Sequence, residues 1–468
     1  MPNHPVLNRS LLPSALLPCV LALAALVVAL AATVTGGGTL GDRSALPAWY
    51  LLDAALFALA VLLLRRVPDR RRVVPLVLAG GVAVAAVGLL APPRTSDDAY
   101  RYVWDGRVQA AGVSPYAHAP DDPALARLRD PGLFPPGDTC AAWDERRTAA
   151  GDCTRINRPA VRTIYPPVAE AWFLAVHPLG GGVRGVQAAG ALLAVATTGV
   201  LLLVGRAEPW RAALWAWCPG VTVWAVNDAH VDTLGALLMV AGLGCAARGR
   251  AAPGGPLWAG VLLGGAVATK LLPALALPGA FSGLLARRPG RREAVRAATV
   301  LAAGVLGADV LAYLPYVVAS GPGVLGYLPG YLREEGYDQG HLDRFGLLRL
   351  VLPDRLAPWA AGLVLAAVVL GVLRRGDRDR PWAGALLVTG TALLLVAPGY
   401  PWYGLLVVAL VALDGRWEWL AVPAAGQVLY LAGGSRVQQA AYGAALAVVL
   451  AGLLVRRAYA PVPNVTKR

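Results

Sequence analysis

The run LLPSALLPCVLALAALVVALAATV, from Leu11 to Val34, decides the kind of protein that this sequence encodes. It contains no charged residue and, as a helix, is long enough to cross the ~30 Å hydrocarbon core of a bilayer. Similar runs recur along the 468 residues, of which 57% are hydrophobic and only 15% are charged. Soluble domains carry about 25% charged residues. We therefore expect an all-α polytopic membrane protein.

The first run follows Arg9, so a cleaved signal peptide is an alternative interpretation. A signal peptide has a shorter apolar region and a clear cleavage site before the next polar stretch. Neither feature is present here, and we expect a retained membrane helix.

Hydropathy predicts about 13–14 membrane helices, with ends uncertain by several residues. The expected ranges are 11–34, 46–64, 73–90, 184–204, 212–226, 233–247, 255–269, 271–285, 297–318, 357–373, 382–397, 404–413, 420–433 and 438–455. Short basic connections separate many of them, and such connections favour the cytoplasmic side. These connections are Arg65 to Arg72, Arg206 to Arg211, Arg248 to Arg250, Arg287 to Arg296, Arg374 to Arg380 and the tail from Arg456 to Arg468. Alternating sides place both termini of this multi-pass cell-membrane protein in the cytoplasm.

This topology divides the chain into five parts. They are N-terminal helices (1–90), a large first extracytoplasmic loop with an interfacial helix (91–183), central helices (184–318), a second extracytoplasmic loop (319–356) and C-terminal helices (357–468). Three central segments of about fifteen residues are short for a span, which is typical of helices that border a cavity. Both large polar loops lie outside, so we expect the functional site on the extracytoplasmic face.

The net charge of +14 would suit a protein that binds nucleic acid. The basic residues are instead divided among short connections between apolar segments, and they form no continuous face. Nucleic-acid binding is therefore excluded as an interpretation of the charge.

Two adjacent carboxylates, Asp97 and Asp98, directly follow a predicted membrane helix. Aspartates at such a boundary can simply end the helix. Alternatively, one carboxylate stays ionised and acts as a general base on a hydroxyl, because Arg101 and Arg107 offset the repulsion between the acids. Guanidinium groups also bind phosphate. Nearby aromatic side chains, Tyr100, Tyr102 and Trp104, offer flat surfaces for sugar rings or lipid headgroups.

Polar residues also interrupt the apolar segments at two outer junctions. Asn227, Asp228, His230 and Asp232 fit a metal cluster, a hydrogen-bonding site or a solvated turn, and such groups are costly near lipid unless they face a polar cavity. Lys270 is the only lysine before position 467. Its ammonium can extend to water or pair with a lipid phosphate.

Three further outer segments carry weaker signals. Tyr165 precedes two prolines, His341 lies in a loop of mixed charge, and Tyr400 and Trp402 belong to an aromatic and proline-rich break. Aromatic residues are common at membrane interfaces, so an anchoring role is the alternative. Asp53 and Asp309 fall inside predicted spans, where acids either act in function or pair across a helix contact.

The cysteines agree with this topology. Cys140 and Cys153 share the outer loop, where oxidation favours a disulfide, and two unpaired thiols are the alternative. Cys19, Cys218 and Cys245 lie in apolar helices and are expected to act as small hydrophobic residues.

Five of these motifs occur in an order that resembles a known class of protein. They are Asp98-Ala99-Tyr100-Arg101-Tyr102 with Pro115-Tyr116, Tyr165-Pro166-Pro167, Ala229-His230-Val231-Asp232, Thr269-Lys270, and Tyr400-Pro401-Trp402-Tyr403. The pattern resembles the GT-C class of membrane glycosyltransferases, and more closely the polyprenol-phosphate-mannose-dependent α-mannosyltransferases of actinobacteria. Val231 stands where that family usually has asparagine, and the insert from Pro120 to Arg162 suggests a different acceptor.

The resemblance implies transfer of a sugar, first of all mannose, from a polyprenyl-phosphate donor to a hydroxyl of a glycolipid, a polysaccharide or a protein. The reaction would invert the anomeric centre on the extracytoplasmic face, with Asp98 or Asp97 as the base. Arg101, Arg107 and Lys270 would bind the phosphate. The other candidate substrate-binding residues are Tyr100, Tyr102, Tyr165, Asn227, His230, Asp232, His341, Tyr400 and Trp402. The resemblance implies no cofactor and leaves dependence on a divalent metal open.

A polytopic transporter or a flippase for lipid-linked sugars of the cell envelope is the main alternative. Such proteins commonly show internal repeats and polar residues near the bilayer midplane. No clear repeat is present, and most acids lie at the outer ends of predicted helices. A structural subunit of an envelope complex is a third interpretation, and it requires no acid pair at a membrane boundary.

Overall fold

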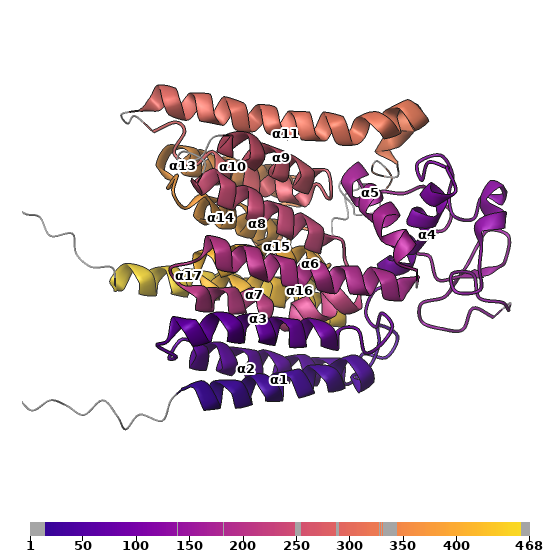
Figure 1. The fold of residues 1–468 in the computed structure, drawn as a ribbon, viewed down its shortest axis with the longest axis horizontal. Coiled ribbons are helices and arrows are strands. Elements are labelled where there is room, and N and C mark those ends of the chain that lie inside the picture. Colours follow the sequence, from indigo (N-terminus) through magenta and orange to yellow (C-terminus); the bar gives the residue numbers. More distant parts are fainter. Residues whose placement is uncertain are drawn as a thin grey trace, which may run out of the picture.

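Apolar helices that lie side by side form the body of the molecule, and a smaller polar module extends beyond one end of them (Figure 1). The computed structural model describes residues 15–137, 139–180, 182–248, 254–286, 290–326, 328, 330 and 344–459. The N-terminal part contains α1 (Leu16–Gly36), α2 (Leu46–Leu64), α3 (Arg70–Val87), α4 (Asp98–Ala110), η1 (Pro123–Leu128), β1 (Arg146–Arg147), β2 (Cys153–Thr154), α5 (Pro167–Val176) and η2 (His177–Leu179). The central part contains α6 (Val183–Val204), η3 (Pro209–Ala212), α7 (Ala213–Ala216), η4 (Val221–Asn227), α8 (Asp232–Arg248), α9 (Gly255–Val267), η5 (Leu272–Ala276), α10 (Leu277–Ala280), α11 (Arg291–Ser320) and η6 (Gly321–Leu325). The C-terminal part contains η7 (Leu348–Leu350), α13 (Ala357–Arg375), α14 (Pro381–Val396), η8 (Pro401–Gly404), α15 (Leu405–Asp414), η9 (Trp417–Leu420), α16 (Ala421–Ala432) and α17 (Ser435–Ala458).

Membrane-spanning helices dominate this architecture. Within the described residues, six helices are long and apolar enough to cross a bilayer, or seven if one bent pair counts as a single span. The six are Leu16–Gly36, Leu46–Leu64, Val183–Val204, Arg291–Leu325, Ala357–Arg375 and Ser435–Ala458. Shorter apolar helices lie among them, at Gly255–Val267, Pro381–Val396 and Pro401–Asp414. The prediction of an all-α, multi-pass membrane protein is confirmed.

Two of the expected spans differ from the prediction. The range 212–226 divides into η3, α7 and the π-helical η4, and the range 271–285 divides into η5 and α10. Pro219, Pro273 and Pro278 explain the breaks, because proline lacks the amide hydrogen and its ring collides with the preceding helical turn. The bent pair η4 and α8 meet at 111°, and the buried polar residues Asn227, Asp228 and His230 lie at the break between them.

Different helices cover the two opposite sides of the bundle. In Figure 1, α11 covers one face, while α1 and α2 cover the opposite face. The central helix α15 lies between them, and all of its residues are buried. Its sequence, LLVVALVALD, is apolar on every side, as expected for a helix that is enclosed by others.

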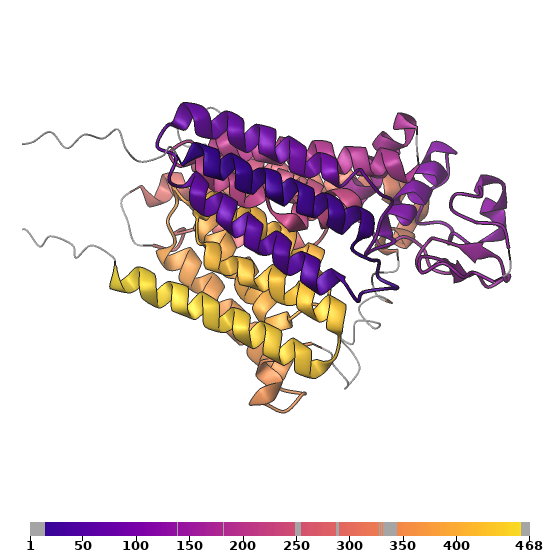
Figure 2. The same cartoon turned by 90° about the horizontal axis from the view of Figure 1, so that it is seen from below.

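The polar module contains α4, η1, α5 and a short hairpin, and it lies beyond the helix ends (Figures 1 and 2). α1 begins and α17 ends at the opposite end of the bundle. Strands β1 and β2 pair antiparallel, with Arg146 opposite Thr154 and Arg147 opposite Cys153. A disulfide between Cys140 and Cys153 closes this insert.

Small residues allow α9 and α11 to approach closely. A Cβ atom added to Gly264 would lie 2.6 Å from the carbonyl oxygen of Val305, and one added to Gly304 would lie 2.6 Å from that of Leu257. Such close backbone contact is a common way for helices to associate in a membrane, where dispersion contacts replace the hydrophobic effect.

We expect Gly264→Leu to destabilise the protein by about 1–3 kcal/mol, because the larger side chain forces the two helices apart. Gly307→Leu is the matched control, since a Cβ at Gly307 meets nothing within 4 Å. The midpoint of thermal unfolding in detergent measures both effects. Equal midpoints for the two variants would contradict the close packing of α9 on α11.

Candidate active site

The acid pair begins helix α4, and a buried carboxylate from the bent span sets its position. Asp228 Oδ1 accepts hydrogen bonds from the backbone amides of Arg94 (3.1 Å), Thr95 (3.0 Å) and Ser96 (3.2 Å). Asp228 Oδ2 accepts a further bond from Thr95 Oγ1 at 2.5 Å. The chain that leads into Asp98 is therefore held directly against the break between η4 and α8.

Asn227 completes this attachment. Its Nδ2 donates to the carbonyl oxygens of Gly88 (3.1 Å), Ala91 (3.0 Å) and Pro92 (3.1 Å), while its Oδ1 accepts from the Arg94 amide at 3.1 Å. Only 1% of its surface is exposed, and it does not line the cavity described below. The structure thus gives Asn227 a positioning role, whereas the sequence suggested contact with substrate.

His230 lies beside Asp98 at the same break. Its Nδ1 is 3.4 Å from Asp98 Oδ2, and its ring stacks on Trp402 with 3.9 Å between centroids and 16° between planes. Nε2 has no hydrogen-bond partner among the described residues, although the side chain is buried. Ala229 before it has φ +55°, a left-handed conformation that turns the chain sharply and aims the imidazole at the acid pair.

Lys270 approaches the site from the opposite side. Its Nζ is 2.6 Å from Asp232 Oδ2 and 4.8 Å from the ring centroid of Tyr403. Asp232 begins α8, and Lys270 follows α9, so two separate helices contribute this ion pair. The carboxylate and the aromatic ring together keep the ammonium in place beside the cavity.

Two residues of the insert reach the acid pair, and the sequence did not indicate either of them. Asn157 Nδ2 donates to Asp98 Oδ1 at 2.5 Å and to Asp97 Oδ1 at 3.0 Å. The Arg146 guanidinium pairs with Asp97 Oδ2. No spacing rule connects these residues to Asp98, and the only available signal was the disulfide-closed insert that carries them.

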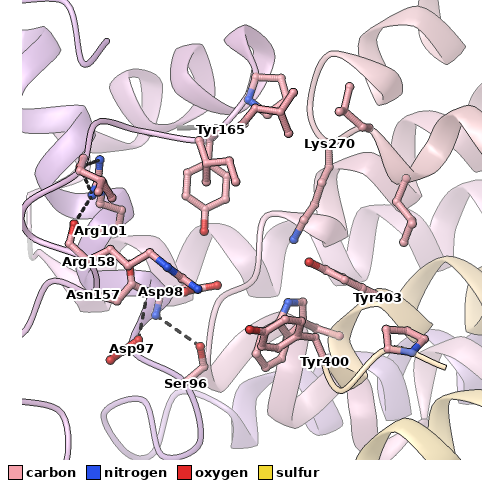
Figure 3. Close-up of a pocket in the computed structure, with 18 of the residues that line it drawn as sticks. Ser96, Asp97, Asp98, Arg101, Asn157, Arg158, Tyr165, Lys270, Tyr400 and Tyr403 are labelled. Carbon is pink, nitrogen blue, oxygen red and sulfur yellow. Dashed lines mark hydrogen bonds between the residues drawn. The ribbon is translucent and has the colours of Figure 1, made fainter. Parts of the chain in front are cut away.

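A cavity of about 730 Å³, with a polar half and an apolar half, is lined by the acid pair, Arg146, Asn157 and Lys270, but not by His230 or Asp232. Asp98, Asn157, Arg158 and Lys270 lie around the polar half, and Figure 3 shows Lys270 across the cavity from Asn157 and Arg158. Apolar side chains from η5 and the residue before it, from α14 and from η6 complete the wall: Leu271, Leu272, Leu275, Ala392, Leu393, Val396, Val324 and Leu325.

The other predicted residues divide into two groups. Arg101, Tyr165, Tyr400 and Trp402 line the same cavity as the acid pair. Tyr100, Tyr102 and Arg107 do not line it. Tyr100 donates to Asp144 Oδ2 at 2.8 Å, Tyr102 is buried against Phe173, and Arg107 pairs with Asp130. His341 lies outside the described residues.

Helical geometry explains this division for Tyr100 and Arg107. An α-helix turns about 100° per residue, so positions two and nine residues after Asp98 fall on the opposite face of α4. Arg101 falls nearer the Asp98 face, but its guanidinium bonds Asp105 at 3.0 Å and the carbonyl oxygen of Val161 at 3.2 Å. Arg101 therefore supports the cavity wall.

The environment separates the two carboxylates electrostatically. Burial raises the pKa of the Asp98 carboxyl, but the neighbouring His230, Lys270 and Asn157 groups outweigh this effect and lower the pKa to about 2. Burial raises the pKa of Asp97 above its ordinary value, although the Arg146 charge opposes the shift. Asp98 therefore has a lowered pKa, whereas its neighbour Asp97 has a raised one.

A second buried acid lies behind the site. Burial and the nearby Asp105 carboxylate raise the pKa of Glu170 well above its ordinary value. Thr163 Oγ1 donates to Glu170 Oε1 at 2.6 Å, and Gln109 Nε2 donates to Oε2 at 2.9 Å. This network joins α4 to α5 and to the irregular segment that precedes Tyr165.

A metal centre has no geometric support in the described part of the chain. No group of three or more histidine, cysteine, aspartate or glutamate side chains is close enough there to hold a metal ion.

Comparison with known proteins gives the class of this site. The family model described as glycosyltransferase family 87 matches residues 163–398, half of the chain, so the protein is a glycosyltransferase. It belongs to glycosyltransferase family 87. The match contains His230, Asp232 and Lys270 but begins after the acid pair and the insert. It confirms the predicted enzyme class and argues against a transporter or flippase.

The other comparisons are more distant. No curated protein matches the chain. Among solved structures, the crystal structure of ArnT from Cupriavidus metallidurans bound to undecaprenyl phosphate is similar at 17% identity, with a TM-score of 0.40, over 82% of this chain and 77% of that one. A likeness at this level assigns neither substrate nor mechanism.

We expect the double variant Cys140→Ser, Cys153→Ser to loosen the insert, because closing a loop of this length is worth ~3 kcal/mol in the chain-entropy model. Limited trypsin digestion should then cut faster after Arg146 or Arg147. Cys245→Ser, which removes a free thiol on α8, is the control. Equal cleavage rates in the two variants would contradict a stabilising role of the disulfide.

Proposed function

We propose that this enzyme transfers a mannosyl residue from a polyprenyl-phosphate donor to an acceptor hydroxyl on the extracytoplasmic face, in an inverting GT-C reaction. The observation that carries the proposal is an ionised carboxylate, Asp98, in a cavity that joins a polar half to an apolar half. A lipid-linked sugar is likewise divided into a polar sugar-phosphate head and an apolar chain.

The apolar half suits a prenyl chain. Its side chains come mainly from η5, α14 and η6, which belong to or adjoin the apolar bundle. Lys270 directly precedes this apolar wall, so a lipid whose chain lies there brings its phosphate close to the ammonium. The positive charge of Lys270 would stabilise the phosphate as it leaves.

Asp98 suits the role of general base. The acceptor oxygen attacks the anomeric carbon and forms the new glycosidic bond, while the bond from that carbon to the phosphate oxygen breaks. The acceptor proton passes to Asp98, and the bonding electrons leave with the lipid phosphate. Attack opposite the phosphate inverts the anomeric centre, so a β-linked donor gives an α-linked product. The phosphate is already a good leaving group and needs a cation more than an acid.

The arrangement of the chain supports an extracytoplasmic site. The polar module and the acid pair lie at the end of the bundle opposite the start of α1 and the end of α17 (Figures 1 and 2). Basic connections favour the cytoplasm for both termini. A lipid-linked donor fits this side, because nucleotide sugars are not available there.

We expect Asp98→Asn to lower the transfer rate by about 10²–10⁴, the usual contribution of a general base. Asp97→Asn should cost about tenfold or less, since Asp97 mainly holds Arg146 and Asn157. The measurement is sugar transfer in vesicles from radiolabelled polyprenyl-phosphate mannose, with the glucose and pentose donors in parallel. Wild-type rates in both variants would rule out the acid pair as the base, and transfer only from another donor would rule out mannose.

We expect Asn157→Ala to move the acidic limb of the pH–rate profile to higher pH. The Asn157 amide lowers the pKa of Asp98, so its removal raises that pKa, and a base must be ionised to act. The pH dependence of kcat/KM in the same vesicles measures the shift. An unchanged acidic limb would show that Asn157 does not tune the base.

A further inference from the structure

The chain from Asn157 to Arg162 forms the cavity wall nearest to Asp98 on the side of the insert. Asn157, Arg158, Val161 and Arg162 all line the cavity there. Arg158 and Arg162 bring two guanidinium groups to this one short wall. The sequence analysis related the insert to the acceptor but gave this wall no role.

A buried guanidinium holds the wall in place. Arg101 is 3% exposed, and its Nη1 donates to the carbonyl oxygens of Val161 at 3.2 Å and Arg158 at 3.5 Å. Asp105 neutralises the buried charge at 3.0 Å. Burying an ion pair is expensive unless its hydrogen bonds are satisfied, and here the pair uses them to fix the backbone that carries Arg158.

Arg158 itself has a strained backbone. Its φ is +46°, a left-handed conformation that is unfavourable for a residue with a side chain and persists only where the surroundings enforce it. The Val161 amide closes the turn by donating to the Arg158 carbonyl oxygen at 3.1 Å. Strain that is enforced by a buried ion pair beside an active site points to a functional constraint on this turn.

The stereochemistry of the proposed reaction indicates which substrate contacts this wall. In an inverting displacement the acceptor approaches from the face opposite the leaving phosphate. Lys270 and the apolar residues form the phosphate side, and Figure 3 shows Arg158 and Asn157 across the cavity from Lys270. The acceptor therefore lies against the wall from Asn157 to Arg162.

We propose that this wall is an acceptor subsite that selects an acceptor with an anionic group, a phosphoryl or a carboxylate, beside the reacting hydroxyl. Guanidinium groups bind both anions through paired hydrogen bonds. The inference rests on the proposed function, because it takes the donor phosphate to lie at Lys270.

Binding of two matched glycosides tests the subsite. Full-length protein in lipid nanodiscs is titrated with octyl α-mannoside 6-phosphate and with neutral octyl α-mannoside. We expect the wild type to bind the phosphorylated glycoside at least tenfold more tightly. The double variant Arg158→Gln, Arg162→Gln should lose most of this preference, and Arg158→Lys, Arg162→Lys should retain part of it because the charge remains.

Arg147→Gln is the control on the same insert. Arg147 is exposed, donates to the Gly151 carbonyl oxygen and does not line the cavity, so this variant should keep the wild-type preference. If the double glutamine variant fails to fold, the single variant Arg162→Gln decides the test, since Arg162 makes no hydrogen bond or ion pair with described residues. Equal affinity of the wild type for both glycosides, or an undiminished preference in the glutamine variants, would overturn the inference.

Undecaprenyl phosphate separates the two possible sources of the anion. At saturating undecaprenyl phosphate, the phosphorylated glycoside should still bind. Competition between the two would place the anion at Lys270 and overturn the inference while leaving the proposed function intact. Absence of undecaprenyl phosphate binding, together with no turnover of any labelled donor, would instead refute the proposed function.

Discussion

The contact between the Asp228 carboxylate and three successive backbone amides, those of Arg94, Thr95 and Ser96, determines the geometry of the whole site. It joins two segments more than 130 residues apart in the chain. One segment supplies Asp98, and the other supplies His230 and Asp232. A buried carboxylate must receive hydrogen bonds to offset its desolvation, so the same bonds that satisfy Asp228 also position Asp98.

Helix breaks supply the polar groups that an apolar bundle otherwise lacks. The 111° bend between η4 and α8 brings Asn227, Asp228 and His230 to an outer junction, and the break after α9 brings Lys270 there. A continuous helix would have satisfied its own backbone and left these side chains facing lipid or other helices. The breaks instead open a cavity whose polar half lies next to its apolar half.

Much of this arrangement could be predicted from the sequence, for physical reasons. Asp98, His230 and Lys270 each interrupt an apolar segment at its outer end, and polar residues in that position must share a polar space. Arg107 and Tyr100 do not line the cavity, because the rotation of α4 turns both side chains away from the face that carries Asp98. Asn157 and Arg146 were not found, since they reach the acid pair from an insert with no periodic pattern. The expected spans at 212–226 and 271–285 were wrong because hydropathy does not register the breaks that proline imposes.

The insert has one further consequence, which concerns how this enzyme can diverge. Its disulfide closes the hairpin that carries Arg146, and Asn157 follows directly after this closed segment, while the apolar wall of the cavity comes from other parts of the chain. Mutations in the hairpin can therefore accumulate without disturbing the helices that form the apolar wall of the cavity. The wall of the cavity on the side of the insert can therefore change its specificity during evolution while the apolar wall stays the same.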